Sequence, residues 1–146
     1  MMTQKMVKKV EINRHKIREI AFQTLFAMNT NAKTDVKDFY VVITDGKYGE
    51  DVPEYLTTLV SGVVEHKEEL DALIEKNLTS GWSITRIAKT DLIIIEVALF
   101  EMKYVDDVPA KVAINEAIEL AKKFSDDRSR KFVNGILSHA HEELVK

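Results

Sequence analysis

Apolar residues recur at intervals of three and four along most of this chain, a spacing typical of amphipathic helices. The first stripe predicts a helix over about 14–29, with Asn13 as its N-cap. Later stripes predict helices at about 34–45, from Pro53 through Val64, at 67–78, from 84 or 90 to 104, from Pro109 to Phe124, and from Asp127 to Glu143. The expected fold class is therefore all-α, a single domain of about seven helices over 13–146. Residues 1–12 show no periodicity and are interpreted as a flexible tail.

The same pattern makes three more specific predictions. The fifth helix is apolar on most sides, which predicts that it lies buried at the centre and is shared by two helical subbundles. The run 40–44 is rich in β-branched residues, so a strand is the alternative to the second helix. Trp82, beside Ile84 and Ile87, is expected to anchor the core rather than to stack on a ligand.

Two glycines interrupt predicted helices. Gly62 and Gly135 each stand inside an apolar stripe, where glycine costs about 1 kcal/mol relative to alanine. Each is expected to permit the close approach of another backbone. Neither belongs to a phosphate-binding loop, because the sequence contains no G-x-G-x-x-G or G-x-x-x-x-G-K-S/T pattern.

Composition narrows the compartment and the class of ligand. The sequence has no cysteine, no secretory signal and no aliphatic run near the ~20 residues that span a bilayer, so we expect a cytoplasmic protein with no membrane partner. The net charge of −3 alone argues against nucleic acid. The charges are unevenly distributed, however, because residues 1–18 hold six basic residues and one acidic, and residues 122–131 hold five basic and two acidic. Two local basic clusters suggest a polyanion bound at a defined place.

The first cluster opens the first helix. Arg14, Arg18, Phe22 and Phe26 are spaced by four and share one side of the helix. Basic side chains there can neutralise phosphates, and adjacent aromatic rings can stack on unpaired bases. The alternative is a solvated charged turn followed by two core phenylalanines, and residue types alone favour it. A basic first turn also opposes the helix dipole by about 0.3–1 kcal/mol, which a bound anion would offset.

The second cluster opens the last helix, where Arg128 and Lys131 are three residues apart and share a face. Signals for an enzyme are weak throughout the chain. His139 and His141 point to different sides of a helix, which disfavours joint metal binding, and no serine occupies a nucleophile elbow. We therefore expect no catalytic residue, no metal site and no cofactor.

Three ungapped blocks resemble the NusB family of antitermination factors, namely 18–26, 108–122 and 131–137. The resemblance extends from about Arg14 to the C-terminal end of the sequence. It implies two three-helix bundles joined by a helix. It also implies binding of the boxA element of ribosomal RNA operon transcripts together with NusE, a small-subunit ribosomal protein, so that RNA polymerase resists premature termination.

The resemblance also assigns roles to particular residues. RNA contacts are implied for Arg14, His15, Lys16, Arg18, Phe26, Arg128, Arg130, Lys131 and Phe132, and a contact with NusE is implied for Asp91. The chain is expected to be a monomer or a homodimer. On this view Arg18→Ala should reduce the affinity for boxA RNA and leave the thermal midpoint nearly unchanged.

This sequence departs from the family pattern in two places. The family has more arginine where Asn13, His15 and Lys16 stand, which implies weaker or more pH-sensitive RNA binding. Leu92 and Glu96 replace two basic residues of the fifth helix, which bears on the protein-partner surface. A helical protein-interaction module without RNA binding remains the main alternative, and the helical domain of a ribosomal RNA methyltransferase is a third.

Overall fold

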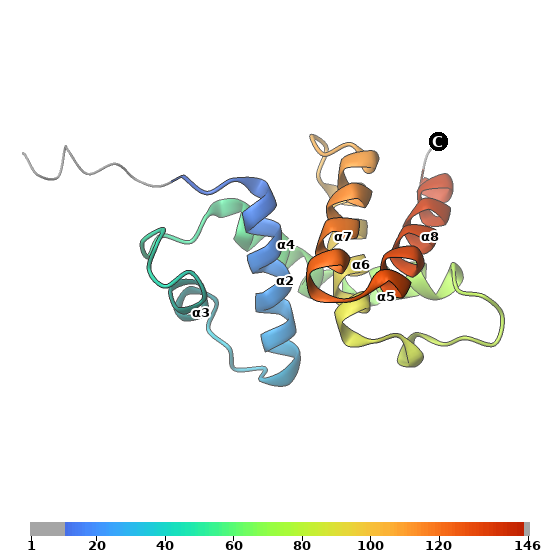
Figure 1. The fold of residues 1–146 in the computed structure, drawn as a ribbon, viewed down its shortest axis with the longest axis horizontal. Coiled ribbons are helices and arrows are strands. Elements are labelled where there is room, and N and C mark those ends of the chain that lie inside the picture. The colour runs from blue at the N-terminus through green and yellow to red at the C-terminus, as the bar shows by residue number, and fades with distance from the viewer. Residues whose placement is uncertain (1–10, 145–146) are drawn as a thin grey trace, which may run out of the picture.

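The computed structural model describes residues 11–144 and contains helices but no strand in that range (Figure 1). Its elements are α2 (Arg14–Thr30), α3 (Val36–Ile43), α4 (Glu54–Glu65), α5 (Lys67–Lys76), the short 3-10 helix η1 (Ile84–Arg86), α6 (Lys89–Tyr104), α7 (Ala110–Phe124) and α8 (Asp127–Leu144). The all-α prediction is confirmed, and α3 is a helix rather than a strand. Most of the predicted flexible tail, residues 1–10, lies outside the described residues.

The helices form two groups around α6. In the first group α2 contacts α3 and α4, and in the second α6, α7 and α8 contact one another. α5 follows α4 after a single residue and packs against α6 and α8, so it links the groups (Figure 1). Every residue of α6 from Asp91 to Glu101 is buried, which confirms the predicted central helix. No helix within residues 11–144 has the length and apolar character needed to cross a membrane.

Side-chain caps define where several helices begin. The Asn13 side chain accepts a hydrogen bond from the Lys16 amide at 2.8 Å, so the predicted cap of α2 is confirmed. Asp126, not Asp127, caps α8, because its Oδ1 accepts from the Ser129 amide at 2.9 Å. Asp127 already has helical geometry and uses its carboxylate on Arg130 instead.

The predictions for three residues, one large and two small, need correction. Trp82 is not a core anchor, since 49% of its surface is exposed and its ring carries the Arg86 guanidinium at 5.1 Å. Gly62 is a site of close approach, but its neighbour is the ring of Phe100 and not a backbone. A Cβ at Gly135 would meet nothing within 4 Å, so the close approach predicted there is wrong.

The substitutions that distinguish α6 from the family pattern fall in the interior. Leu92 and Glu96 are both buried, so they shape the core rather than a partner surface. Lys67 Nζ donates to Glu96 Oε2 at 2.9 Å and to Asp71 Oδ2 at 3.1 Å, and Asp71 Oδ1 is buried with no partner. Burial of the carboxyl group and the neighbouring Asp71 raise the pKa of Glu96 to about 8. A proton on Glu96 supplies a donor beside the orphaned Asp71 oxygen.

We predict that Gly62→Ala destabilises the protein and that Gly135→Ala does not. The new methyl group at position 62 overlaps the Phe100 ring, and overpacking of this kind costs about 1–3 kcal/mol. The methyl group at position 135 enters open space and gains up to about 1 kcal/mol of helix propensity. Urea unfolding of both variants measures the difference. Equal stabilities would contradict the assigned contact with Phe100.

We also predict a pH-dependent effect of Glu96→Gln. Folded Glu96 keeps its proton to about pH 8, whereas an unfolded glutamate releases it near pH 4.3. The folded state therefore binds more protons between these values, and the free energy of unfolding falls as pH rises through this window. The variant lacks this loss, so its stability relative to wild type should increase from pH 5 to pH 8. Denaturant titrations across that pH range measure the difference in the free energy of unfolding. The control is Glu119→Gln, since Glu119 is exposed. A similar pH trend in the control would contradict the raised pKa assigned to Glu96.

Candidate nucleic-acid interface

Arg14, His15 and Lys16 form the first basic group, in a turn of α2 that carries no acidic residue. Arg14 Nη1 lies 3.2 Å from Asp107 Oδ1, and its guanidinium lies 3.9 Å from the centre of the Tyr55 ring. His15 Nδ1 lies 2.7 Å from Glu116 Oε1. All three basic side chains remain at least two-fifths exposed. Acidic residues from other elements therefore offset the unfavourable charge at this helix start while leaving it accessible.

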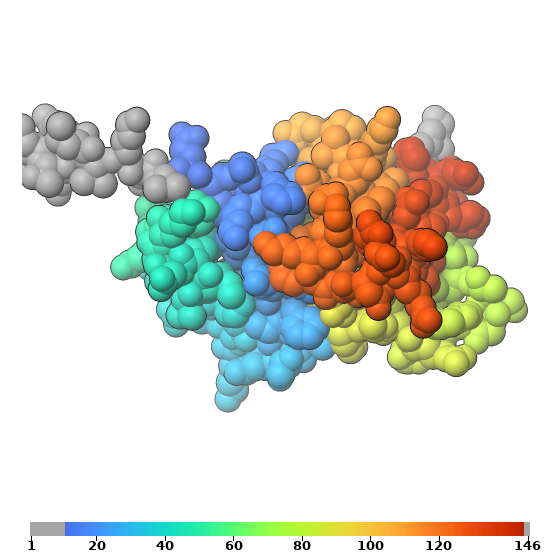
Figure 2. Space-filling model, in the orientation of Figure 1, coloured from blue at the N-terminus to red at the C-terminus, as the bar shows by residue number. Residues whose placement is uncertain are grey.

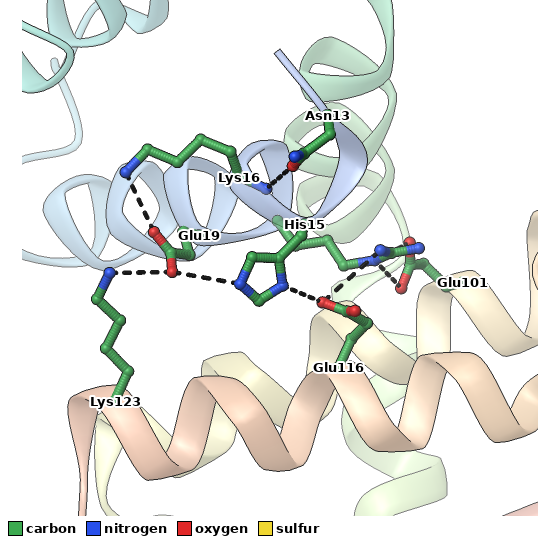
Figure 3. Close-up of polar contacts among 8 residues, drawn as sticks. Asn13, His15, Lys16, Glu19, Glu101, Glu116 and Lys123 are labelled. Carbon is green, nitrogen blue, oxygen red and sulfur yellow. Dashed lines mark hydrogen bonds and ion pairs between the residues drawn. The ribbon is translucent and has the colours of Figure 1, made fainter.

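Glu19 connects the first basic group to the end of α7 (Figure 3). Its carboxylate accepts hydrogen bonds from Lys16 Nζ at 3.3 Å and from Lys123 Nζ at 3.0 Å. Burial alone would raise the pKa of Glu19, but the hydrogen bonds from Lys123 and Lys16 outweigh it and hold that pKa below its usual value. Lys123 thus extends the basic surface from α2 onto α7, although the sequence analysis did not single it out as a site residue.

Arg18 lies inside the protein, whereas the sequence predicted an exposed RNA contact that adds little to stability. Its Nε donates to both carboxylate oxygens of Glu101, at 3.0 and 2.8 Å, and Tyr55 donates its hydroxyl to the same carboxylate. Both side chains of the ion pair are almost fully buried. The expectation that Arg18→Ala leaves the thermal midpoint unchanged is therefore wrong, because the substitution strands a buried carboxylate.

Arg128, Arg130 and Lys131 form the second basic group, in the first two turns of α8. Arg128 and Lys131 are exposed, and no ion pair within the described part of the chain engages Lys131. Arg130 is half-buried, with Nη2 held 2.6 Å from Asp127 Oδ1. Phe132 is partly buried and lines a surface cavity with Lys131 and Trp82. In this group Arg130 is paired with Asp127, whereas Lys131 is a cation that no carboxylate of the described residues neutralises.

Asp91, the residue implied to contact a protein partner, is buried at the start of α6. Its Oδ2 accepts a hydrogen bond from Ser129 Oγ at 2.9 Å, and its Oδ1 has no partner. Burial raises the pKa of Asp91, even though the Ser129 hydroxyl stabilises the carboxylate. The side chain lines a cavity of about 480 Å³ that also contains Trp82 and Arg128. The cavity is therefore a route by which a partner could approach Asp91.

The two basic groups lie near opposite ends of α7. The first faces Glu116 and the loop before α7, whereas the second begins at Arg128, four residues after α7 ends. A helix of the length of α7 measures about 22 Å. Figure 2 shows α2 in blue beside α7 in orange, with the start of α8 next to the end of α7. Lys123 lies along this seam, where it bonds to Glu19 of α2.

Phe26 is the exposed aromatic residue on this path. The row Arg14, Arg18, Phe22 and Phe26 enters the core and returns to the surface, where 40% of Phe26 is exposed. It borders a cleft of about 480 Å³ between α2, α3 and the end of α7. Within residues 11–144 no cluster of three His, Asp or Glu side chains is arranged to hold a metal ion. The arrangement suits binding of an extended anion with unpaired bases, and it offers no catalytic constellation.

Comparison with known proteins identifies one family that this chain matches over most of its length. The NusB family model matches residues 15–142. The transcription antitermination protein NusB of Levilactobacillus brevis is 53% identical over 134 residues, which cover 90% of this chain and 94% of the relative. More than five hundred curated proteins match the sequence of this chain at a statistically significant level.

Solved structures agree with the sequence comparison. The NusB structure from T. maritima has a TM-score of 0.80 and 30% identity, over 92% of this chain and 94% of that chain. A structure described as the antitermination factors NusB and NusE in complex with dsRNA has a TM-score of 0.75 and 26% identity, over 89% of this chain and 96% of that chain.

We predict that Arg18→Ala lowers the free energy of unfolding by about 3–5 kcal/mol, because Glu101 stays buried without its partner. Arg14→Ala, which removes an exposed pair with Asp107, should cost about 1 kcal/mol or less. Thermal and denaturant unfolding of the two variants compare these effects directly. Similar small losses in both would contradict the structural role of Arg18.

Proposed function

Because the chain belongs to the NusB family, whose curated relatives are transcription antitermination proteins, we propose that it binds RNA and acts without catalysis of its own. The RNA is the boxA element of ribosomal RNA operon transcripts, and binding prevents premature termination. The observation that supports this proposal is the seam of α2 and α7, along which the first basic group, Lys123 and exposed Phe26 lie and which ends near the start of α8.

Each side chain contributes according to its exposure. Arg14, His15, Lys16, Arg128 and Lys131 contact phosphates, which position the strand, while Phe26 and Phe132 contact bases. Arg130 contacts RNA only through the part of its guanidinium that Asp127 leaves free. Arg18 supports RNA binding indirectly, by holding α2 against α6 through Glu101.

The protein partner is NusE, as in the solved complex of NusB, NusE and dsRNA. We propose that NusE enters the cavity beside Asp91, where a donor from the partner would satisfy the unpaired Oδ1. The assembly then acts on RNA polymerase in the cytoplasm. A monomer exposes the whole basic surface, whereas a homodimer that covers it would have to dissociate before RNA binds.

A helical protein-interaction module without RNA binding is the second candidate. One observation favours it, because Asp107, Glu116 and Glu19 already pair with every residue of the first basic group. On that view both basic groups serve only solvation and intramolecular pairing.

We predict that the protein shifts boxA RNA in a gel at lower concentration than a scrambled RNA of equal length, and that NusE strengthens the shift. Lys131→Ala should weaken binding and reduce the slope of log affinity against log salt by about 0.7, the value for one lost phosphate contact on a single strand. Lys47→Ala, a surface lysine between α3 and α4, is the matched control and should bind as wild type does.

Two results would count against the proposal. Equal affinity for boxA and scrambled RNA, with and without NusE, would remove boxA recognition. Binding of NusE that is insensitive to salt, with no RNA binding by wild type, would favour the protein-interaction module instead.

A further inference from the structure

The cleft beside Phe26 has walls of aromatic rings, and we call it the aromatic groove. Its cavity of about 480 Å³ is lined by Phe22 and Phe26 of α2, Phe39 of α3 and Phe124 of α7. The Phe22 ring lies 4.8 Å from that of Phe124 and 6.0 Å from that of Phe26, measured between centroids. Phe22 forms the buried base of the groove, and Phe26, Phe39 and Phe124 form partly exposed walls.

Two polar side chains also line the aromatic groove. Gln23 and Thr90 are partly buried there, and neither side chain has a hydrogen-bond partner within the described residues. A glutamine amide presents a donor and an acceptor side by side, and a threonine hydroxyl can do either. The groove therefore combines apolar walls with two polar side chains that no other described residue engages, which is the composition of a site for a small, flat, polar-edged ring.

The aromatic groove lies on the seam that joins the two basic groups. Gln23 follows Glu19 by one helical turn, and Glu19 bridges Lys16 and Lys123. The Lys123 ammonium lies 5.7 Å from the centre of the Phe124 ring, at the border of the groove. α8, with the second basic group, starts three residues after Phe124. A strand whose phosphates touch both groups would therefore pass over the groove.

We propose that the aromatic groove holds one unstacked nucleobase of the bound RNA, with Gln23 and Thr90 hydrogen-bonding to its edge. This assignment rests on the proposed RNA binding and adds a base-reading subsite to it. An apolar protein side chain would leave both polar groups unsatisfied, and a second copy of this chain would set the basic rim of one copy against that of the other. A base on a single strand avoids both costs, because its rings face the phenylalanines and its phosphates face the lysines.

The test combines a groove variant with RNAs in which each nucleotide in turn lacks its base. With wild type, one abasic position should cost about 5-fold or more in affinity, as expected for a lost stacking contact. Phe39→Ala should lower the affinity for intact RNA by a similar factor. For this variant, removing the base at that one nucleotide should then cause no further loss of affinity, while the effects of the other abasic positions stay as in wild type. This non-additivity identifies the nucleotide that occupies the groove.

Gln23→Ala provides a second variant that keeps the helix and the apolar walls intact. It should reduce discrimination among the four bases at the same nucleotide and leave the other positions unchanged. Val42→Ala is the control, since Val42 lies on α3 with Phe39 but is 76% exposed and does not line the groove. Thermal midpoints verify that each variant is folded.

The outcomes separate this proposal from the function on which it rests. If wild type binds boxA RNA but both groove variants show the wild-type abasic profile, the subsite is refuted and RNA binding survives. If Phe39→Ala weakens binding to isolated NusE or dissociates a homodimer while the abasic profile is unchanged, the groove is a protein contact and the subsite is likewise refuted. If wild type does not bind boxA RNA, the proposed function fails first.

Discussion

A single buried ion pair ties the first group of helices to the second. Arg18 on α2 donates hydrogen bonds to both carboxylate oxygens of Glu101 on α6, and Tyr55 on α4 donates to the same carboxylate. Removing two charges from water is costly, and hydrogen bonds to both carboxylate oxygens offset that cost. The pair holds α2 against α6. Since Arg14, His15 and Lys16 lie one turn earlier, the placement of the first basic group depends on this contact.

In the buried part of α6 an acidic residue replaces a basic one, and the fold is kept. The family pattern has a basic residue where Glu96 stands. Here the buried carboxyl group of Glu96 and the carboxylate of Asp71 both accept hydrogen bonds from Lys67. A proton on Glu96 reduces the repulsion between two carboxylates and leaves one net ion pair in the low-dielectric interior. Because this exchange is internal, it leaves the surface formed by α2, α7 and α8 unaltered.

Local sequence was sufficient for the helices and insufficient for the positions of several side chains. Periodicity located α2 and its Asn13 cap, because both depend on residues within one turn. The burial of Arg18 depends on Glu101, 83 residues later, and no local pattern reports such a partner. The exposure of Trp82 likewise depends on distant residues, since its side chain lines a surface cavity with Lys131 and Phe132 of α8 instead of entering the core. The aromatic groove brings together three helices and the start of a fourth, which a stripe on one helix cannot reveal.

The two basic groups differ in how far nearby carboxylates neutralise their charge. Phosphates approaching Arg14, His15 or Lys16 must compete with Asp107, Glu116 and Glu19, so each exchange of carboxylate for phosphate gains little free energy. Lys131 has no such competitor and supplies attraction to any polyanion. An acidic protein with only a few uncompensated cations binds random RNA weakly. Under the proposed function, selective affinity comes from contacts that only particular bases satisfy, and Gln23 and Thr90 line the apolar cleft beside the seam of α2 and α7. On that proposal, intramolecular pairing of the basic residues lowers the attraction to random RNA and leaves selectivity to the contacts with bases.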